Sequence, residues 1–158
     1  MYKRVLVPLD GSPLGEGVLP FLLQIPGPLD MAVVLLRVLE PVMPIVVEGV
    51  RDVPVPDPGV RRRDAEQYLA PIVASLRARG VDASWEIRAG RPDEEIVEAA
   101  TAAGADLIAM STHGRSGLGR LLFGSVAEQV LRHADVPVFL LRQSSRRPAE
   151  ARVAEVRR

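Results

Sequence analysis

Cysteine is absent from the 158 residues, so disulfides, thiolate metal sites and cysteine nucleophiles are excluded. Only two histidines are present, which is too few for a histidine-rich metal site. No run approaches the roughly 18 apolar residues that a membrane-spanning helix needs, and no signal peptide is recognisable at the amino terminus. We therefore expect a cytoplasmic protein that has no membrane segment.

Lysine is almost absent, because Lys3 is the only lysine among the 20 basic residues. The chain consequently lacks a Gly-Lys-Ser or Gly-Lys-Thr step, and a Walker A phosphate loop is excluded. The 20 basic residues balance 20 acidic ones, so the overall charge does not indicate nucleic acid or a membrane surface as a partner. Apolar residues make up 47% of the chain, which is enough for the hydrophobic core of one domain.

The apolar segments alternate between two patterns. Short runs rich in β-branched residues predict strands, whereas longer segments with an apolar stripe or with capping signals predict helices. The expected strands are 4–8, 31–38, 83–88, 106–110 and 136–141, and the expected helices are 13–24, 61–79, 92–103 and 126–133. This alternation predicts an α/β fold, an open five-stranded parallel sheet of Rossmann-like type in the order 3-2-1-4-5 with helices on both faces.

Two segments fall outside the alternation. Residues 41–59 hold five of the 14 prolines, which predicts a long loop between the second strand and the second helix. Residues 143–158 carry five arginines and two glutamates, which predicts a basic, flexible tail. Residues 1–142 are then expected to form the single folded domain.

Ligands of open parallel sheets bind at the carboxyl ends of the strands, so the segments that follow the strands are candidate site residues. After the first strand, Pro8, Leu9, Asp10 and Ser12 place a carboxylate beside a helix start. The segment after the fourth strand, 111–125, is rich in glycine, serine and arginine. Glycine lets backbone amides approach an anion closely, and the first amides of the following helix add further donors. This segment is a candidate phosphate-binding loop.

A purely structural explanation of the same residues stays open. Ser125 and Glu128 have the spacing of a capping box, which would close the helix start without any ligand. His113 either donates to a phosphate or bonds to its own backbone in a turn. Asp10, His113 and a serine are also compatible with a hydrolase triad, but the chain has no Gly-x-Ser-x-Gly elbow.

Three segments resemble the universal stress proteins. They are Val5-Leu-Val-Pro-Leu-Asp-Gly-Ser12, Gly90-Arg-Pro-Asp-Glu-Glu-Ile96 and Asp106-Leu-Ile-Ala-Met-Ser-Thr-His-Gly-Arg-Ser-Gly-Leu-Gly-Arg-Leu-Leu-Phe-Gly-Ser125. The resemblance covers residues 2–142. The ATP-binding branch of that family carries a glycine, two residues, a second glycine, nine residues and then Gly-Ser or Gly-Thr. Gly114, Gly124 and Ser125 match this pattern, whereas Ser111 replaces its first glycine.

The resemblance implies a stress-response regulatory protein that binds ATP, with Mg²⁺ beside the triphosphate and at most slow hydrolysis. Asp10 and the backbone near Val38 would hold the adenosine. The phosphates would face the segment after the fourth strand, with Met110 at its base. The full expected set is Pro8, Leu9, Asp10, Ser12, Val38, Met110, Ser111, His113, Gly114, Arg115, Gly124, Ser125 and Val126. The alternative is a nucleotide-free protein–protein interaction module on the same scaffold, and position 111 discriminates between the two.

The two edge strands of the predicted sheet differ in charge. Residues 83–88 alternate, with Trp85 and Ile87 expected inward and charged residues outward, whereas 136–141 carry no charge. An apolar edge strand is prone to aggregation unless something covers it. We therefore expect two copies to pair antiparallel through Val136–Leu141, which the resemblance also implies. The expected partners are an adenine nucleotide and a second copy, with neither nucleic acid nor a membrane.

Overall fold

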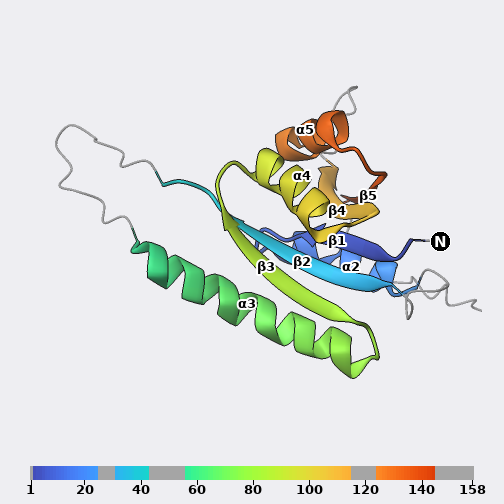
Figure 1. The fold of residues 1–158 in the computed structure, drawn as a ribbon, viewed down its shortest axis with the longest axis horizontal. Coiled ribbons are helices and arrows are strands. Elements are labelled where there is room, and N and C mark those ends of the chain that lie inside the picture. The colour runs from blue at the N-terminus through green and yellow to red at the C-terminus, as the bar shows by residue number, and fades with distance from the viewer. Residues whose placement is uncertain (1, 25–30, 43–55, 115–123, 145–158) are drawn as a thin grey trace, which may run out of the picture.

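The computed structural model describes residues 2–24, 31–42, 56–114 and 124–144. They form a five-stranded sheet in the order β3-β2-β1-β4-β5, and every pair of neighbouring strands is parallel (Figure 1). The strands are β1 Arg4–Pro8, β2 Ala32–Leu39, β3 Ala83–Ala89, β4 Leu107–Gly114 and β5 Val138–Ser144. The predicted α/β fold and its strand order are confirmed.

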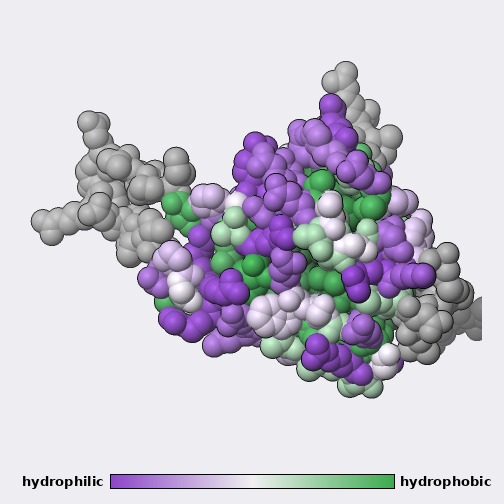
Figure 2. All heavy atoms as spheres, viewed as in Figure 1, coloured by the Kyte–Doolittle hydropathy of each residue, from purple (hydrophilic) through white to green (hydrophobic). Residues whose placement is uncertain are grey.

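Helices cover both faces of the sheet. α1 (Pro13–Glu16), α2 (Val18–Leu22) and α3 (Pro58–Ala78) pack on one face, and α4 (Pro92–Ala103) and α5 (Ser125–His133) pack on the other. The outer surfaces of α4 and α5 are mainly hydrophilic in the view of Figure 2, as expected of helices whose apolar stripe faces a sheet. None of the described helices is long and apolar enough to cross a membrane.

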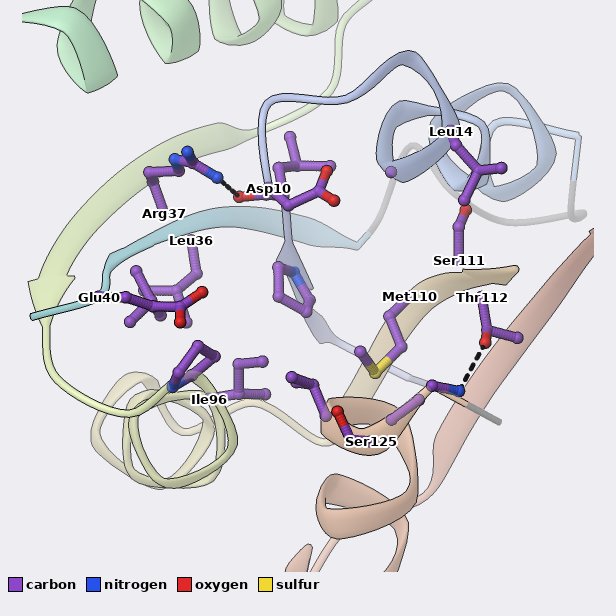
Figure 3. A pocket seen from close by; sticks show the side chains of 18 residues that line it. Asp10, Leu14, Leu36, Arg37, Glu40, Ile96, Met110, Ser111, Thr112 and Ser125 are labelled. Carbon is purple, nitrogen blue, oxygen red and sulfur yellow. Dashed lines mark hydrogen bonds between the residues drawn. The ribbon is translucent and has the colours of Figure 1, made fainter. Parts of the chain in front are cut away.

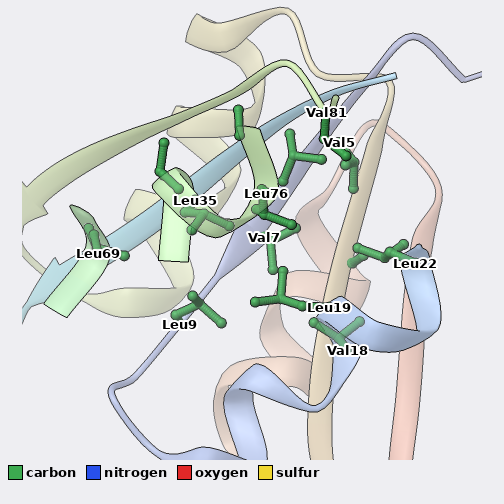
Figure 4. Close-up of a cluster of buried hydrophobic side chains, with 14 of the residues drawn as sticks. Val5, Val7, Leu9, Val18, Leu19, Leu22, Leu35, Leu69, Leu76 and Val81 are labelled. Carbon is green, nitrogen blue, oxygen red and sulfur yellow. The ribbon is translucent and has the colours of Figure 1, made fainter. Parts of the chain in front are cut away.

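The central strand β1 is buried on both sides. Val5 and Val7 pack in one hydrophobic cluster with α2 and α3 (Figure 4), while Leu6 belongs to a second cluster with α4 and α5. None of these three side chains is exposed to solvent. Because successive strand residues point to opposite faces, a strand covered on both sides must be apolar throughout, which explains the unbroken apolar runs in the sequence.

The predicted first helix, 13–24, is divided in two at Gly17. It starts as predicted, with Ser12 at the N-cap and Pro13 at the first helical position. Pro20 has no amide hydrogen to bond the carbonyl of Glu16, and the Gly17 amide bonds to Leu14 three residues back. The helix is therefore interrupted by Pro20, which the sequence pattern had placed inside one continuous helix.

The predicted loop 41–59 is shorter than expected, because α3 begins at Pro58 rather than at residue 61. The Asp57 carboxylate caps α3 by accepting from the amides of Gly59 at 2.8 Å and Val60 at 3.2 Å. The remaining part of this loop, 43–55, lies outside the described residues.

Strand β4 runs four residues beyond its predicted end at Met110. Its last residues pair with β5, Ser111 with Leu141 and Gly114 with Ser144. Pairing with β5 satisfies backbone groups that a loop would have left free, and no local pattern reveals that pairing. Position 111 therefore lies in a strand, and β5 continues past residue 142. The predicted tail from residue 145 onward lies outside the described residues.

Candidate functional site

A pocket of about 300 Å³ opens at the carboxyl ends of β1, β2 and β4 (Figure 3). β2 lies on one side of β1 in the sheet and β4 on the other, so the pocket lies where the strand order reverses. Its lining comes from the ends of these strands, from α1 and α4, and from the first turn of α5.

Nine of the 13 predicted site residues line this pocket: Pro8, Leu9, Asp10, Val38, Met110, Ser111, Gly124, Ser125 and Val126. Ser12 lies next to it and hydrogen-bonds to Asp10. His113 and Gly114 are the last two residues of β4. Arg115 lies outside the described residues.

Nine further residues that the sequence did not indicate also line the pocket: Leu14, Gly15, Leu36, Arg37, Glu40, Pro92, Ile96, Thr112 and Ala127. Glu40 directly follows β2, so the rule applied to β1 and β4 would have found it. Pro92 and Ile96 reach the pocket only because α4 packs over the sheet, and no sequence signal reveals this.

The Asp10 carboxylate is held in place by Ser12. The amide and the hydroxyl of Ser12 both donate to Asp10 Oδ1, at 2.9 and 2.6 Å, and the Gly15 amide donates to Ser12 Oγ at 3.0 Å. Burial opposes ionisation of Asp10, but the hydrogen bonds from Ser12 and the charge of Arg37 outweigh it and lower its pKa below 3.8. Asp10 is therefore a carboxylate at neutral pH, with Oδ2 as the oxygen that can accept from a ligand.

Acidification tests this arrangement. Because the pKa of Asp10 is lower in the folded chain than in the unfolded chain, its stabilising contribution is complete above the unfolded value, 3.8, and disappears as the pH falls through the folded value. We expect the free energy of unfolding of the unmodified chain to decline more than that of Asp10→Asn as the pH drops below 3.8. Urea titrations at a series of pH values measure this difference, and a constant difference would contradict the assignment.

Arg37 fixes the other side of the same loop. Its Nη1 donates to the carbonyl of Leu9 at 3.2 Å. The guanidinium lies over Gly11, where a Cβ would meet it at 3.6 Å and where the φ of 85° favours glycine. The end of β2 therefore anchors the turn that carries Asp10.

The first turn of α5 faces the pocket from the opposite side. Gly124 occupies the N-cap, its amide donates to Thr112 Oγ1 at 3.3 Å, and its carbonyl accepts from the Glu128 amide. The predicted capping box is wrong, because Ser125 is the first helical residue rather than the N-cap and no side chain caps the helix. The amides of residues 125–127 precede the first helical hydrogen bond, so they have no carbonyl partner within α5.

Nothing in the described part of the chain requires a glycine at position 124. Its φ of −55° and ψ of 151° suit any residue, and a Cβ built on it would meet none of the described residues within 4 Å. With respect to the described residues, the glycine leaves open space at the edge of the pocket, directly before three amides that have no partner within α5, at the positive end of the helix. Such a place fits an anion that approaches the backbone closely.

The pocket is polarised from end to end (Figure 3). Asp10 and Glu40 supply carboxylates and Arg37 a guanidinium on the β1 and β2 side, whereas Thr112, Ser125 and the first amides of α5 lie on the β4 and α5 side. Apolar side chains lie among the lining residues: Leu36, Val38, Ile96 and Met110. A complementary ligand carries hydrogen-bond donors at one end, an anion at the other and an apolar surface between them.

A profile of the universal stress protein family matches residues 1–142. The chain belongs to this family. A universal stress protein of Methanocaldococcus jannaschii is 30% identical over 145 residues, which are 90% of this chain and 84% of that protein. Several other curated relatives match this chain over only about half of their own length, 51–56%.

The solved structure of a second universal stress protein of that organism has 26% sequence identity and a TM-score of 0.68, and the match covers 92% of this chain and 99% of that one. Two further structures carry nucleotides. A universal stress protein in complex with cAMP has 23% identity and a TM-score of 0.64, with 89% and 97% covered. An Arabidopsis thaliana family member with AMP bound has 18% identity and a TM-score of 0.62, with 90% and 93% covered.

Proposed function

We propose that this universal stress protein binds an adenine nucleotide in the polarised pocket, and that it acts as a regulatory protein rather than as an efficient catalyst. The phosphates would lie at the amides of residues 125–127, beside Gly124. The ribose hydroxyls would donate to Asp10, and the base would lie on the apolar lining near Val38. The observation that carries the proposal is the space at Gly124 that no described residue fills, since neither its backbone conformation nor its packing against those residues requires a glycine there.

ATP is the nucleotide that the glycine spacing favours, with Mg²⁺ bound to it. Mg²⁺ retains most of its waters and takes oxygen ligands from the phosphates, so few protein ligands are needed. Among the described residues, no group of three potential metal ligands gathers at one point. Water molecules would complete the shell. The cytoplasm, where adenine nucleotides are abundant, is the compartment in which we propose that the protein acts.

Calorimetric titration with ATP, AMP and adenosine, with and without Mg²⁺, tests the proposed function. Because the helix amides act on the phosphate, we expect both nucleotides to bind at least tenfold more tightly than adenosine, a difference of about 1.4 kcal/mol or more. Mg²⁺ should strengthen the binding of ATP more than that of AMP. Equal affinity for AMP and adenosine would contradict the placement of the phosphates at α5.

The alternative function is a nucleotide-free interaction module, and the replacement of the first glycine of the motif by Ser111 favours it. The same titration decides between the two, because such a module would bind none of the three compounds in a folded state.

We also propose that the protein forms a homodimer through β5. This strand is at the edge of the sheet, and the residues of the expected interface, Val136–Leu141, include five apolar side chains that are only partly buried. Phe139 packs within its own chain, since its ring stacks on Phe21 with centroids 5.3 Å apart. The interface is therefore attributed to the open backbone edge and to the side chains that flank it.

A further inference from the structure

The Glu40 side chain lines the pocket, but the contacts of the described residues leave its carboxylate unused. Glu40 directly follows β2, and its backbone is fixed there because its carbonyl accepts from Arg61 Nη2 at 2.7 Å. None of the hydrogen bonds or ion pairs between described residues includes its side-chain oxygens. With respect to that part of the chain, both oxygens remain free to accept from a ligand.

The alternation of side chains along β2 places Glu40 on the pocket side of the sheet. Leu36 and Val38 belong to the hydrophobic cluster beneath α4 and α5, whereas Leu39 packs in the cluster beneath α3. The Gly90 amide still bonds to the carbonyl of Leu39, the last residue of β2. Because successive residues of an extended chain point to opposite faces, Glu40 follows Leu36 and Val38 on their side. The carboxylate therefore lies at the end of the apolar wall on which we place the base.

Glu40 and the start of α5 are at opposite ends of the pocket. Figure 3 shows the Glu40 side chain directed across the pocket from the end of β2, with Thr112 and Ser125 on the far side. In a nucleoside monophosphate, the base and the phosphate are attached to opposite ends of the ribose. A nucleotide whose phosphate lies at the amides of α5 therefore brings its base towards Glu40.

We propose that Glu40 accepts a hydrogen bond from the amino group of the bound base, and that this contact makes Glu40 a specificity-determining residue. The inference rests on the proposed function. An ionised carboxylate has acceptors and no donors, so it complements the 6-amino group of adenine, whose hydrogens are donors. A base without that group leaves the carboxylate unpaired when the ligand displaces its water, and the site therefore disfavours such a base.

The experiment uses a ligand that differs from AMP in this group alone. Purine riboside 5′-monophosphate has a hydrogen atom in place of the 6-amino group and keeps the same ribose and phosphate. The measured quantity is the ratio of the affinity for AMP to the affinity for this analogue. Because Glu40 is exposed, water competes for its carboxylate, so we expect Glu40→Ala to lower the ratio about three- to tenfold. Glu40→Gln keeps a carbonyl oxygen that accepts, so it should lower the ratio less.

The matched control is Glu94→Ala, which removes an equal charge from the first turn of α4. Glu94 pairs with Arg91 at 2.9 Å and lines a separate groove between α4 and α5. Its charge acts on the phosphate that both ligands share, so the ratio should stay unchanged. An unchanged ratio in the folded Glu40→Ala variant would overturn the role of Glu40 and leave the proposed function intact, as would an equal decrease in Glu94→Ala. Absence of binding of either ligand by the folded, unmodified chain would overturn both.

Discussion

Replacing Gly124 by valine is expected to weaken the binding of ATP and of AMP at least tenfold, a loss of about 1.4 kcal/mol or more. The branched side chain would occupy the space that a Cβ currently finds empty, next to the amides that we assign to the phosphate. The fold should tolerate the change, because the backbone of Gly124 has dihedral angles that valine adopts easily. Valine is a poorer N-cap than glycine, so we expect a decrease of about 1 kcal/mol or less in the free energy of unfolding.

The control for this substitution is Gly59→Val. Gly59 also lies in the first turn of a helix, α3, far from the pocket. A Cβ there would meet Asp57 Oδ1 at 2.9 Å, so the capping carboxylate must shift, and we expect a loss of about 1 kcal/mol in stability without an effect on nucleotide binding. Calorimetry and urea unfolding should show a loss of affinity for Gly124→Val alone, whereas both variants stay folded. A folded Gly124→Val variant that binds AMP as tightly as the unmodified chain would remove the phosphate assignment.

The second large effect concerns the dimer. The carbonyl of Pro137 bonds to Ile108 of β4, so residue 137 faces the sheet and the backbone of Val138 faces the open edge. Val138→Pro removes the outward amide and places a ring where a second copy would pair. Proline is tolerated at the first residue of an edge strand, so the monomer should remain folded. We expect the variant to be monomeric at concentrations at which the unmodified chain is a dimer.

Light scattering at micromolar concentration measures the mass of each variant. Glu86→Ala, on the opposite edge strand β3, is the control, and it should leave the mass unchanged. A monomeric unmodified chain would contradict the proposed dimer. So would a Val138→Pro variant that retained the dimer mass.

The fold could be predicted from the sequence because each element carries its own local signal. α4 has the predicted bounds, with Pro92 at its start and Gly104, at a φ of 61°, after its end. Trp85 and Ile87 pack inward against the cluster beneath α3, as the alternation in β3 predicts. These features depend on residues close together in the chain, so the sequence predicts them without knowledge of the elements they pack against.

The errors lie where distant segments meet. The end of β4 was predicted as a loop because its pairing with β5 leaves no local trace in the sequence. Ser111 consequently lies in a strand rather than in the predicted loop. The N-cap of α5, which is Gly124, was predicted to be Ser125 because the spacing of a capping box does not reveal which residue adopts the N-cap conformation. The contribution of Ile96 to the pocket depends on helix packing over the sheet, which periodicity does not specify.

Amide resonances recorded by NMR during a titration with AMP test the central claim most directly, because they locate the nucleotide residue by residue. We predict that the largest saturable shifts occur at Ser125, Val126 and Ala127, with smaller ones at the Asp10 loop. Shifts confined to another surface, such as the groove between α2 and α3 lined by Leu23 and Ile72, would contradict the account. So would a spectrum that AMP leaves unchanged at millimolar concentration.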